Sequence, residues 1–362
     1  MSELLPFLKS LISAPGLSGH EESIRKLIED EWRPLTDELT ISRLGSLHGL
    51  KRGNRTEPST PEGEHPPSKP SILLAAHMDA IGLMVTGLVD GFLRVTQIGG
   101  LDPRVLPGQL VTVHGRQDLP GIIVIPPASL LPADAQSGPV DLKYMLVDTG
   151  VPHGRLVNLV RVGDLISFSQ EPIELKDDTL GGHSLDNRAS LAALTQCLQE
   201  LQGRLHFWDT WIVATVQEEE TMGGALTSAF QLRPDLAVAV DVTYGKGPGT
   251  PDHKGFALGK GPVLGWGPNI HSGLHLAFKQ LADQQEIPYN IEPMPRHSGT
   301  DAYALQVAAE GIPTMVVSIP LRYMHTPVEV VSVKDIQRTG HLLAEFIARL
   351  EPDFLEGLKW DQ

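Results

Sequence analysis

Residues 71–79 read Ser-Ile-Leu-Leu-Ala-Ala-His-Met-Asp, an apolar run that ends in two side chains of the types that bind metal ions. Three later segments follow the same pattern: 211–216 precedes Glu218 and Glu219, 236–240 precedes Asp241, and 314–319 precedes His325. Apolar runs of this length predict short strands covered on both faces, and functional groups in such sheets gather beyond the strands' carboxyl ends. We therefore expect four distant segments to deliver His, Asp and Glu side chains to one place, an arrangement typical of metal hydrolases.

The composition limits the class of protein. With 362 residues the chain is longer than one hydrophobic core usually supports, so we expect two domains. The net charge of −15 argues against nucleic acid or an anionic membrane as a partner. A single cysteine, Cys197, excludes an internal disulfide and a cysteine zinc site. The first residues lack the pattern of a signal peptide and no apolar run approaches a membrane span, so a soluble cytoplasmic protein is expected.

The pattern of apolar, Gly and Pro residues changes twice along the chain. Between residues 82 and 169, short β-type runs alternate with Gly and Pro, which predicts a small β-barrel or sandwich. From Ser184 onward helical patterns alternate with strands, which indicates an α/β fold. We expect one α/β domain from residues 1–81 and 170–362, with a mixed, mostly parallel sheet covered by helices, interrupted by a β-rich insert. The Pro-rich stretch from Gly53 to Lys69 is expected to form a surface loop.

Each candidate residue also has an ordinary structural explanation. A histidine after an apolar run, such as His77, is more often packed in a core, although Asp79 could supply the carboxylate partner that a ligating imidazole normally has. The acidic residues 218–220 are of a kind usually found in a solvated turn. Stacked negative charges at the end of a buried strand nevertheless cost energy unless cations neutralise them.

The remaining candidates are also ambiguous one by one. Asp186 precedes a helical pattern and also fits a helix cap, Asp241 also fits an ordinary turn, and His325 also fits an ordinary loop. Taken together, two histidines, three ligating carboxylates and one spare carboxylate suffice for a two-metal site that needs no cysteine.

Several short motifs occur in order over nearly the whole chain. They are Ala-Ala-His77-Met-Asp79, Ile98-Gly-Gly-Leu-Asp-Pro-Arg, Leu185-Asp186-Asn-Arg188, Gln217-Glu218-Glu219, Val240-Asp241-Val-Thr, Gly299-Thr-Asp301-Ala and His325-Thr-Pro-Val-Glu329. With these motifs the chain resembles the M42 family of metallo-aminopeptidases, which includes the tetrahedral, self-assembling TET aminopeptidases. Each motif alone is modest evidence, and their combination is specific.

The resemblance implies two divalent metal ions per chain, zinc or cobalt. It assigns the ligands as follows: His77 and Asp241 to one ion, Glu219 and His325 to the other, and Asp186 bridging both. Glu218 would be the general base that deprotonates the metal-bridging water, and Asp79 would orient His77. Because neighbouring residues of a strand face opposite ways, the backbone must leave the strand before Glu218 and Glu219 for both to reach the site.

The resemblance also implies a function: an aminopeptidase that acts on short peptides. The insert at 82–169 would mediate dimer contacts, and dimers would assemble into dodecamers. Three departures from the family pattern, Ala80, Asn187 and Thr221-Met222, leave the five ligands intact and bear on the substrate pocket instead. The sequence does not indicate the preferred amino-terminal residue, the native metal or the number of subunits.

Rival functions remain open at this stage. A related co-catalytic enzyme, either a carboxypeptidase or an amide deacylase, would use the same ligands. A glycoside hydrolase of the endoglucanase type could use paired carboxylates such as Glu218 and Glu219, although glycosidase acids flank the sugar from two sides. A non-catalytic assembly subunit would not need Glu218. A serine hydrolase or nucleotide enzyme is disfavoured because the characteristic motifs of both are missing from the sequence.

Overall fold

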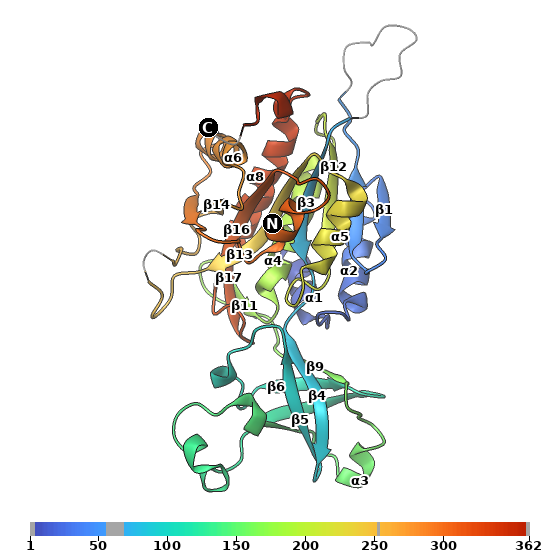
Figure 1. The fold of residues 1–362 in the computed structure, drawn as a ribbon, viewed down its shortest axis with the longest axis vertical. Helices are drawn as coiled ribbons and strands as arrows, with labels where there is room; N and C mark the ends of the chain where they lie inside the picture. The colour runs from blue at the N-terminus through green and yellow to red at the C-terminus, as the bar shows by residue number, and fades with distance from the viewer. Residues whose placement is uncertain (1–3, 56–68, 252–253, 360–362) are drawn as a thin grey trace.

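The computed structural model describes residues 4–55, 69–251 and 254–359. It contains an α/β domain and a β-barrel that projects from one end of that domain (Figure 1). The predicted fold class, an α/β domain with an inserted small β-barrel, is therefore confirmed. The surface loop expected at 53–69 falls for the most part outside the described residues.

The α/β domain is built on one mixed sheet. Its strands are β1 (Glu38–Ile41), β2 (Leu47–Lys51), β3 (Ser71–His77), β10 (Ile173–Glu174), β11 (Thr179–Gly182), β12 (Asp209–Thr215), β13 (Leu236–Tyr244), β14 (Val263–Trp266), β15 (Asn290–Pro293), β16 (Thr314–Arg322) and β17 (Glu329–Ser332). In the described chain the order is β1-β2-β12-β3-β13-β16-β17-β11-β10, and β14 joins β15 to β16. The four central strands, β12, β3, β13 and β16, are parallel. Both flanks of this central group are antiparallel.

Helices cover both faces of this sheet. They are α1 (Leu4–Ser13), α2 (Glu22–Trp32), α4 (Leu185–Leu201), α5 (Gly223–Leu232), α6 (Ser272–Gln284), α7 (Asp301–Gln306) and α8 (Val333–Arg349). Helices α4 and α8 pack against each other and on the central strands, whereas α5 and α7 form a second packed pair. The central strands are apolar along almost their whole length because both of their faces are buried.

Two central strands are longer than the sequence predicts. Strand β13 continues through Asp241 to Tyr244, and β16 continues past Ile319 to Arg322. The expectation that the first of these strands stops before Asp241 is therefore wrong. The physical reason is non-local: β13 and β16 pair in parallel as far as Tyr244 and Leu321, so ladder hydrogen bonds extend both strands beyond their apolar runs.

The barrel is closed and antiparallel, in the order β4-β5-β8-β7-β6-β9. Its strands are β4 (Gly82–Val89), β5 (Phe92–Ile98), β6 (Leu110–His114), β7 (Asp118–Val124), β8 (Leu146–Asp148) and β9 (Leu165–Phe168), and the short helix α3 (His153–Leu156) lies between the last two. The barrel has its own hydrophobic core.

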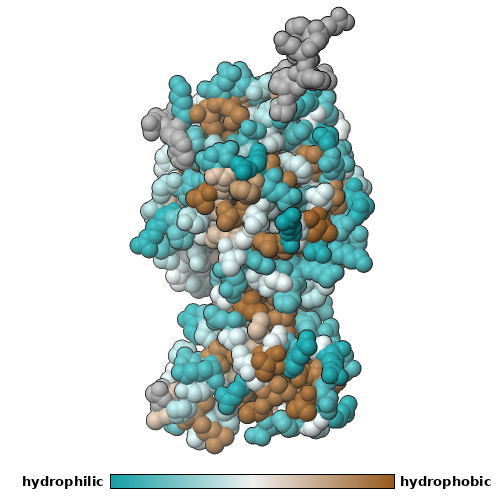
Figure 2. All heavy atoms as spheres, turned by 45° about the vertical axis from the view of Figure 1, so that its right-hand side comes forward, coloured by the Kyte–Doolittle hydropathy of each residue, from teal (hydrophilic) through white to brown (hydrophobic). Residues whose placement is uncertain are grey.

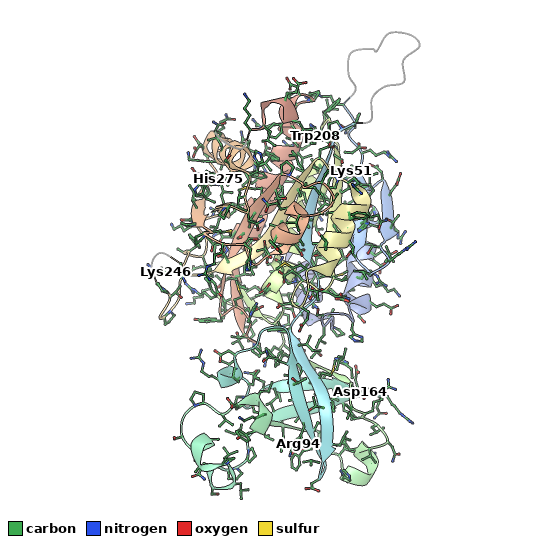
Figure 3. All side chains as sticks on the ribbon, in the orientation of Figure 1. Lys51, Arg94, Asp164, Trp208, Lys246 and His275 are labelled. Atoms are coloured by element: carbon green, nitrogen blue, oxygen red, sulfur yellow. The ribbon has the colours of Figure 1, made fainter. Side chains whose placement is uncertain are left out.

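The barrel joins the sheet at the carboxyl ends of the parallel strands, because β3 ends at His77 and β4 begins only five residues later, at Gly82. A Cβ atom at Gly82 would lie 2.2 Å from Leu17 Cδ2, so the two domains approach each other closely here. The opposite end of the α/β domain is closed by Trp208, which is fully buried and donates from Nε1 to the Glu351 carbonyl at 2.9 Å (Figure 3). None of the described helices is long and apolar enough to span a membrane.

Candidate metal centre

Two groups of potential ligands lie at the carboxyl edge of the sheet and share one residue. The first group is His77, Asp186 and Asp241, and the second is Asp186, Glu219 and His325. Within each group the ligand atoms lie within 4.8 Å of one another. The structure thus brings together all five residues that the sequence analysis named as ligands.

Asp186 lies between the two histidines. Its Oδ1 is 3.2 Å from His77 Nε2, and its Oδ2 is 3.5 Å from His325 Nε2. Asp241 Oδ1 is 3.9 Å from His77 Nε2, and Glu219 Oε2 is 3.8 Å from His325 Nε2. Each oxygen of the Asp186 carboxylate therefore faces a different group, as a carboxylate that bridges two cations must.

The start of α4 places Asp186 in this position. Asp186 and Asn187 have non-helical backbone angles, so the chain enters the helix through an irregular turn. The side-chain amide of Asn187 donates to the Val240 carbonyl at 2.8 Å and ties the turn to β13. The carboxylate of Asp186 contacts the histidines rather than capping the helix.

Asp79 links His77 to the turn that carries the two glutamates. Its two carboxylate oxygens accept hydrogen bonds from the backbone amides of Glu218 at 3.0 Å and Glu219 at 3.2 Å. Its Oδ1 is also 3.4 Å from His77 Nδ1, and its backbone carbonyl is 3.2 Å from the same nitrogen. Strand β12 ends at Thr215, and Gln217 adopts a positive φ of 59°. The backbone therefore leaves the strand before Glu218, as expected from the sequence.

Glu329 is a buried residue of the site to which the sequence analysis gave no role. It is 1% exposed, and its two oxygens accept from the backbone amides of Asp186 and His325, each at 3.1 Å. One carboxylate thus ties the shared residue to a histidine of the second group. The sequence places Glu329 at the end of the motif that begins at His325 but does not reveal this role, because its hydrogen bonds go to backbone atoms, one of which lies 143 residues away in the chain.

Two further charged residues are buried behind the centre. Asp301 accepts from the Thr215 hydroxyl at 2.5 Å, and burial raises its pKa to about 6. Arg188 donates from Nη1 to the carbonyls of Leu11 and Ala14, and burial lowers its pKa to about 10. The guanidinium places positive charge near Asp79 and Glu329.

The electrostatics of the centre favour a cation. Burial, together with the neighbouring Asp186, raises the pKa of Glu219 and of Asp241 to about 8. Burial and nearby carboxylates also raise the pKa of Glu218 well above its usual value. Buried carboxylates in this number repel one another unless positive charge is added. Imidazole nitrogens with carboxylate oxygens are a donor set that suits zinc and related divalent ions, so the residues fit a metal pair.

The barrel contributes backbone to the wall of the centre. Gly99 and Gly100 follow β5, and the Gly99 amide donates to Glu220 Oε1 at 2.7 Å. A Cβ atom at Gly100 would lie 2.8 Å from His325 Nδ1, closer than side chains tolerate. Residue 100 must therefore be glycine if His325 is to keep its position.

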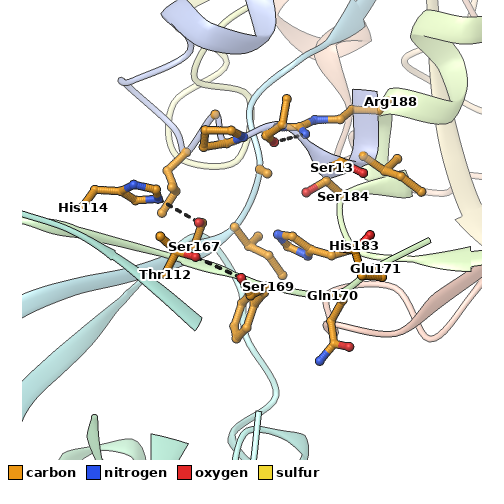
Figure 4. A pocket seen from close by; sticks show the side chains of 18 of the residues that line it. Ser13, Thr112, His114, Ser167, Ser169, Gln170, Glu171, His183, Ser184 and Arg188 are labelled. Atoms are coloured by element: carbon orange, nitrogen blue, oxygen red, sulfur yellow. Dashed lines mark hydrogen bonds between the residues drawn. The ribbon is translucent and has the colours of Figure 1, made fainter. Parts of the chain in front are cut away.

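Two cavities lie near this edge of the sheet. One, of about 230 Å³, is lined by His77, Asp186, Glu218, Asp241 and His325. The other, of about 240 Å³, lies at the junction with the barrel and is lined in part by His114, His183 and Arg188 (Figure 4). Because only the first contains members of both ligand groups, it is the cavity in which a substrate would meet the metal centre.

Comparison with known proteins agrees with this geometry. A model of the family described as M42 glutamyl aminopeptidase matches residues 62–342. The lysyl aminopeptidase of Pyrococcus furiosus is 35% identical over 351 residues, which cover 95% of this chain and 97% of that protein.

Solved structures show the same fold over the whole chain. The TET aminopeptidase of the marine sediment archaeon Thaumarchaeota archaeon SCGC AB-539-E09 superimposes with a TM-score of 0.90 and 28% identity, covering 99% of this chain and 100% of that one. The TET1 peptidase of Pyrococcus horikoshii, which can assemble into a tetrahedron or a large octahedral shell, has a TM-score of 0.82 and 27% identity over 96% of this chain and 100% of that one.

Replacing Gly100 with alanine should weaken metal binding at the second group. The new Cβ would displace the His325 ring from Asp186 and Glu219. We expect metal affinity at that group to fall by roughly 10- to 100-fold, the range seen when a ligand loses its support. Elemental analysis at limiting metal would measure the change.

Gly87→Ala is the matched control, because a Cβ atom there would meet only Arg94 at 3.8 Å. Unchanged metal affinity in Gly100→Ala, or an equal loss in both variants, would contradict the role assigned to this contact.

Proposed function

The chain belongs to the M42 glutamyl aminopeptidase family of metallo-aminopeptidases, and from this membership we propose that it is a two-metal enzyme that removes amino-terminal residues from short peptides. The main observation in support of the proposal is the position of Asp186. One of its oxygens faces His77 of the first ligand group, and the other faces His325 of the second. A one-metal hydrolase has no use for such a shared carboxylate.

The proposed ligand assignment follows these groups. His77 and Asp241 would hold one ion, Glu219 and His325 the other, and Asp186 both. Zinc and cobalt suit the mixed nitrogen and oxygen donors. Two divalent ions bound there would supply Lewis-acid chemistry, which makes water more acidic and stabilises a developing oxyanion. We assign to Asp79 the orientation of His77, which the contacts of its carboxylate and carbonyl with His77 Nδ1 support.

Glu218 is the proposed general base. It belongs to neither ligand group, yet it lines the same cavity, and its Oε2 lies 3.8 Å from His77 Nε2. A carboxylate in this position would take a proton from the attacking water and deliver it to the leaving amine. Its raised pKa, caused mainly by burial, supports this role because the side chain can hold the proton between the two steps.

The family and its relatives differ in the amino-terminal residue that they remove. The family is described by a glutamyl activity, whereas the Pyrococcus furiosus relative is a lysyl aminopeptidase. These two side chains carry opposite charges. Family membership therefore supports the reaction and peptide substrates without fixing which residue is removed.

We propose that the insert at 82–169 mediates assembly into a dimer and then a dodecamer. Relatives with the same fold assemble as TET complexes. The barrel face in Figure 2 shows several hydrophobic areas among polar ones. Exposed apolar residues of the barrel region are Leu110, Ile122, Ile125, Leu130, Val157 and Val162. An exposed apolar surface of this kind supports a contact with another subunit.

Glu218→Gln should abolish turnover while keeping both metal ions, because the amide preserves the shape of the side chain but cannot accept a proton. The expected loss in kcat is at least about 100-fold, the usual scale for a general base. Elemental analysis would report the metal content and a peptide assay the rate. Residual activity near the parent level would show that another group accepts the proton, and loss of one metal would move Glu218 into the ligand set.

A free amino terminus should be required for cleavage. We expect the metal-loaded enzyme to hydrolyse a short peptide and to leave its amino-terminally acetylated form intact in a chromatographic assay. Comparable cleavage of both peptides would favour a carboxypeptidase or amide deacylase instead. Release of sugar oligomers from cellulose would favour the endoglucanase alternative.

A variant with glutamate at Leu110, Leu130, Val157 and Val162 should form a smaller particle than the parent in light scattering. All four side chains are exposed, so each isolated chain should still fold. The control carries glutamate at Leu205 and Phe230, which are exposed on the α/β domain. A barrel variant of unchanged size, or a monomeric parent, would contradict assembly through the barrel.

A further inference from the structure

The cavity at the candidate metal centre is lined by other residues besides the ligands. Beyond the two ligand groups its lining includes Val242, Thr243, Glu292, Met294 and Met324. Glu292 lies on β15, which in the described part of the chain is joined to the central sheet through β14 alone. The cavity therefore has a side wall beside its ligands, made by β13, which also carries Asp241, and by β15 with the loop residues Met294 and Met324.

Glu292 is the unusual member of this wall. Its Oε2 is buried without a hydrogen-bond partner among the described residues. The Thr243 hydroxyl is hydrogen-bonded to the same carboxylate, but burial outweighs this contact and raises the pKa of Glu292. A buried carboxylate oxygen without a protein partner is costly, so this position favours a hydrogen-bond donor from a molecule bound in the cavity.

The charge of the lining points to the kind of donor. No lysine or arginine is among the described residues that line the cavity, and both of its histidines belong to the ligand groups. Apart from the ligands and Glu218, Glu292 is the one charged side chain in that lining. The free charge that a substrate side chain would meet is therefore negative.

The apolar residues of the side wall suit the aliphatic stem of a long cationic side chain. Val242, Met294 and Met324 offer hydrophobic contacts, and methionine adapts to flexible aliphatic chains. Lysine and arginine combine an aliphatic stem with a cationic end. A glutamate or aspartate side chain would instead bring a second negative charge next to Glu292.

We propose that Glu292 is a specificity-determining residue and that the enzyme prefers peptides whose amino-terminal residue is lysine or arginine. This inference rests on the proposed aminopeptidase function. It adds the substrate class, which neither the fold nor the ligand set supplies.

The test compares lysyl, norleucyl and glutamyl chromogenic amides with the metal-loaded full chain. Norleucine has the same aliphatic stem as lysine without the ammonium group. We expect kcat/KM for the lysyl amide to exceed that for the norleucyl amide by roughly 10- to 100-fold, the range of a hydrogen bond to a charged group. The glutamyl amide should be the poorest substrate.

Glu292→Gln should bring the lysyl to norleucyl ratio of kcat/KM close to one. The matched control is Glu356→Gln, which removes the same charge from an exposed position on η5 (Phe354–Gly357) outside the cavity lining and should leave the ratio unchanged. If Glu292→Gln slows all three amides equally, Glu292 binds the substrate's α-amine and the inference is wrong. A parent ratio near one, or a preference for the glutamyl amide, would also overturn it.

A measurement on the unmodified enzyme tests the inference without depending on whether a variant folds. Free L-lysine should inhibit hydrolysis of the norleucyl amide at a concentration at least about tenfold lower than free L-norleucine does. Equal inhibition would contradict the inference while leaving the aminopeptidase function intact. If the metal-loaded enzyme cleaves none of the aminoacyl amides, the proposed function itself fails.

Discussion

The arrangement of the molecule depends on holding several buried carboxylates beside two histidines in one small volume. Each carboxylate must be kept from turning away toward water, and the protein achieves this by fixing backbone around the ligands. Asp79 accepts from the amides of Glu218 and Glu219, and Glu329 accepts from those of Asp186 and His325. Hydrogen bonds to carboxylates are stronger than those between neutral groups. Two acidic side chains that belong to neither ligand group therefore set the positions of three ligands and of the proposed base.

This constraint also explains where the barrel is inserted. The chain leaves the α/β domain directly after His77 and Asp79, at the edge where the ligands gather. The segment after β5 returns to the same edge, where Gly99 and Gly100 pack against Glu219 and His325. The insert is thus in contact with the second ligand group. Any displacement of the barrel relative to the sheet would move the wall against which His325 rests.

The sequence predicts the ligands better than it predicts what holds them. A ligand type of residue after an apolar run is a local pattern, and parallel strands bring such positions to one edge. Glu329 leaves no such pattern, because it accepts from the amide of Asp186, 143 residues away. The length of β13 was missed for a similar reason, since pairing with β16 extends it. Glu292 was missed because it lies on a short, partly exposed strand, which reaches the cavity through the pairing of β15 with β14 and of β14 with β16.

The charges of the centre and of Glu292 have to be considered together. Asp186, Glu219 and Asp241 would bring three negative charges to two divalent ions, and an ionised Glu218 would bring a fourth. Four negative charges balance two divalent cations, so these four side chains and the bound ions together would carry little net charge. Glu292 lies outside both ligand groups and takes no part in this balance. Among the residues that line the cavity, it would then be the carboxylate whose charge the metal ions leave uncompensated. A substrate with a cationic amino-terminal side chain would compensate the charge of Glu292. The metal ions would neutralise the ligand carboxylates and not Glu292, so the metal centre would support both the chemistry and the selection of a cationic substrate.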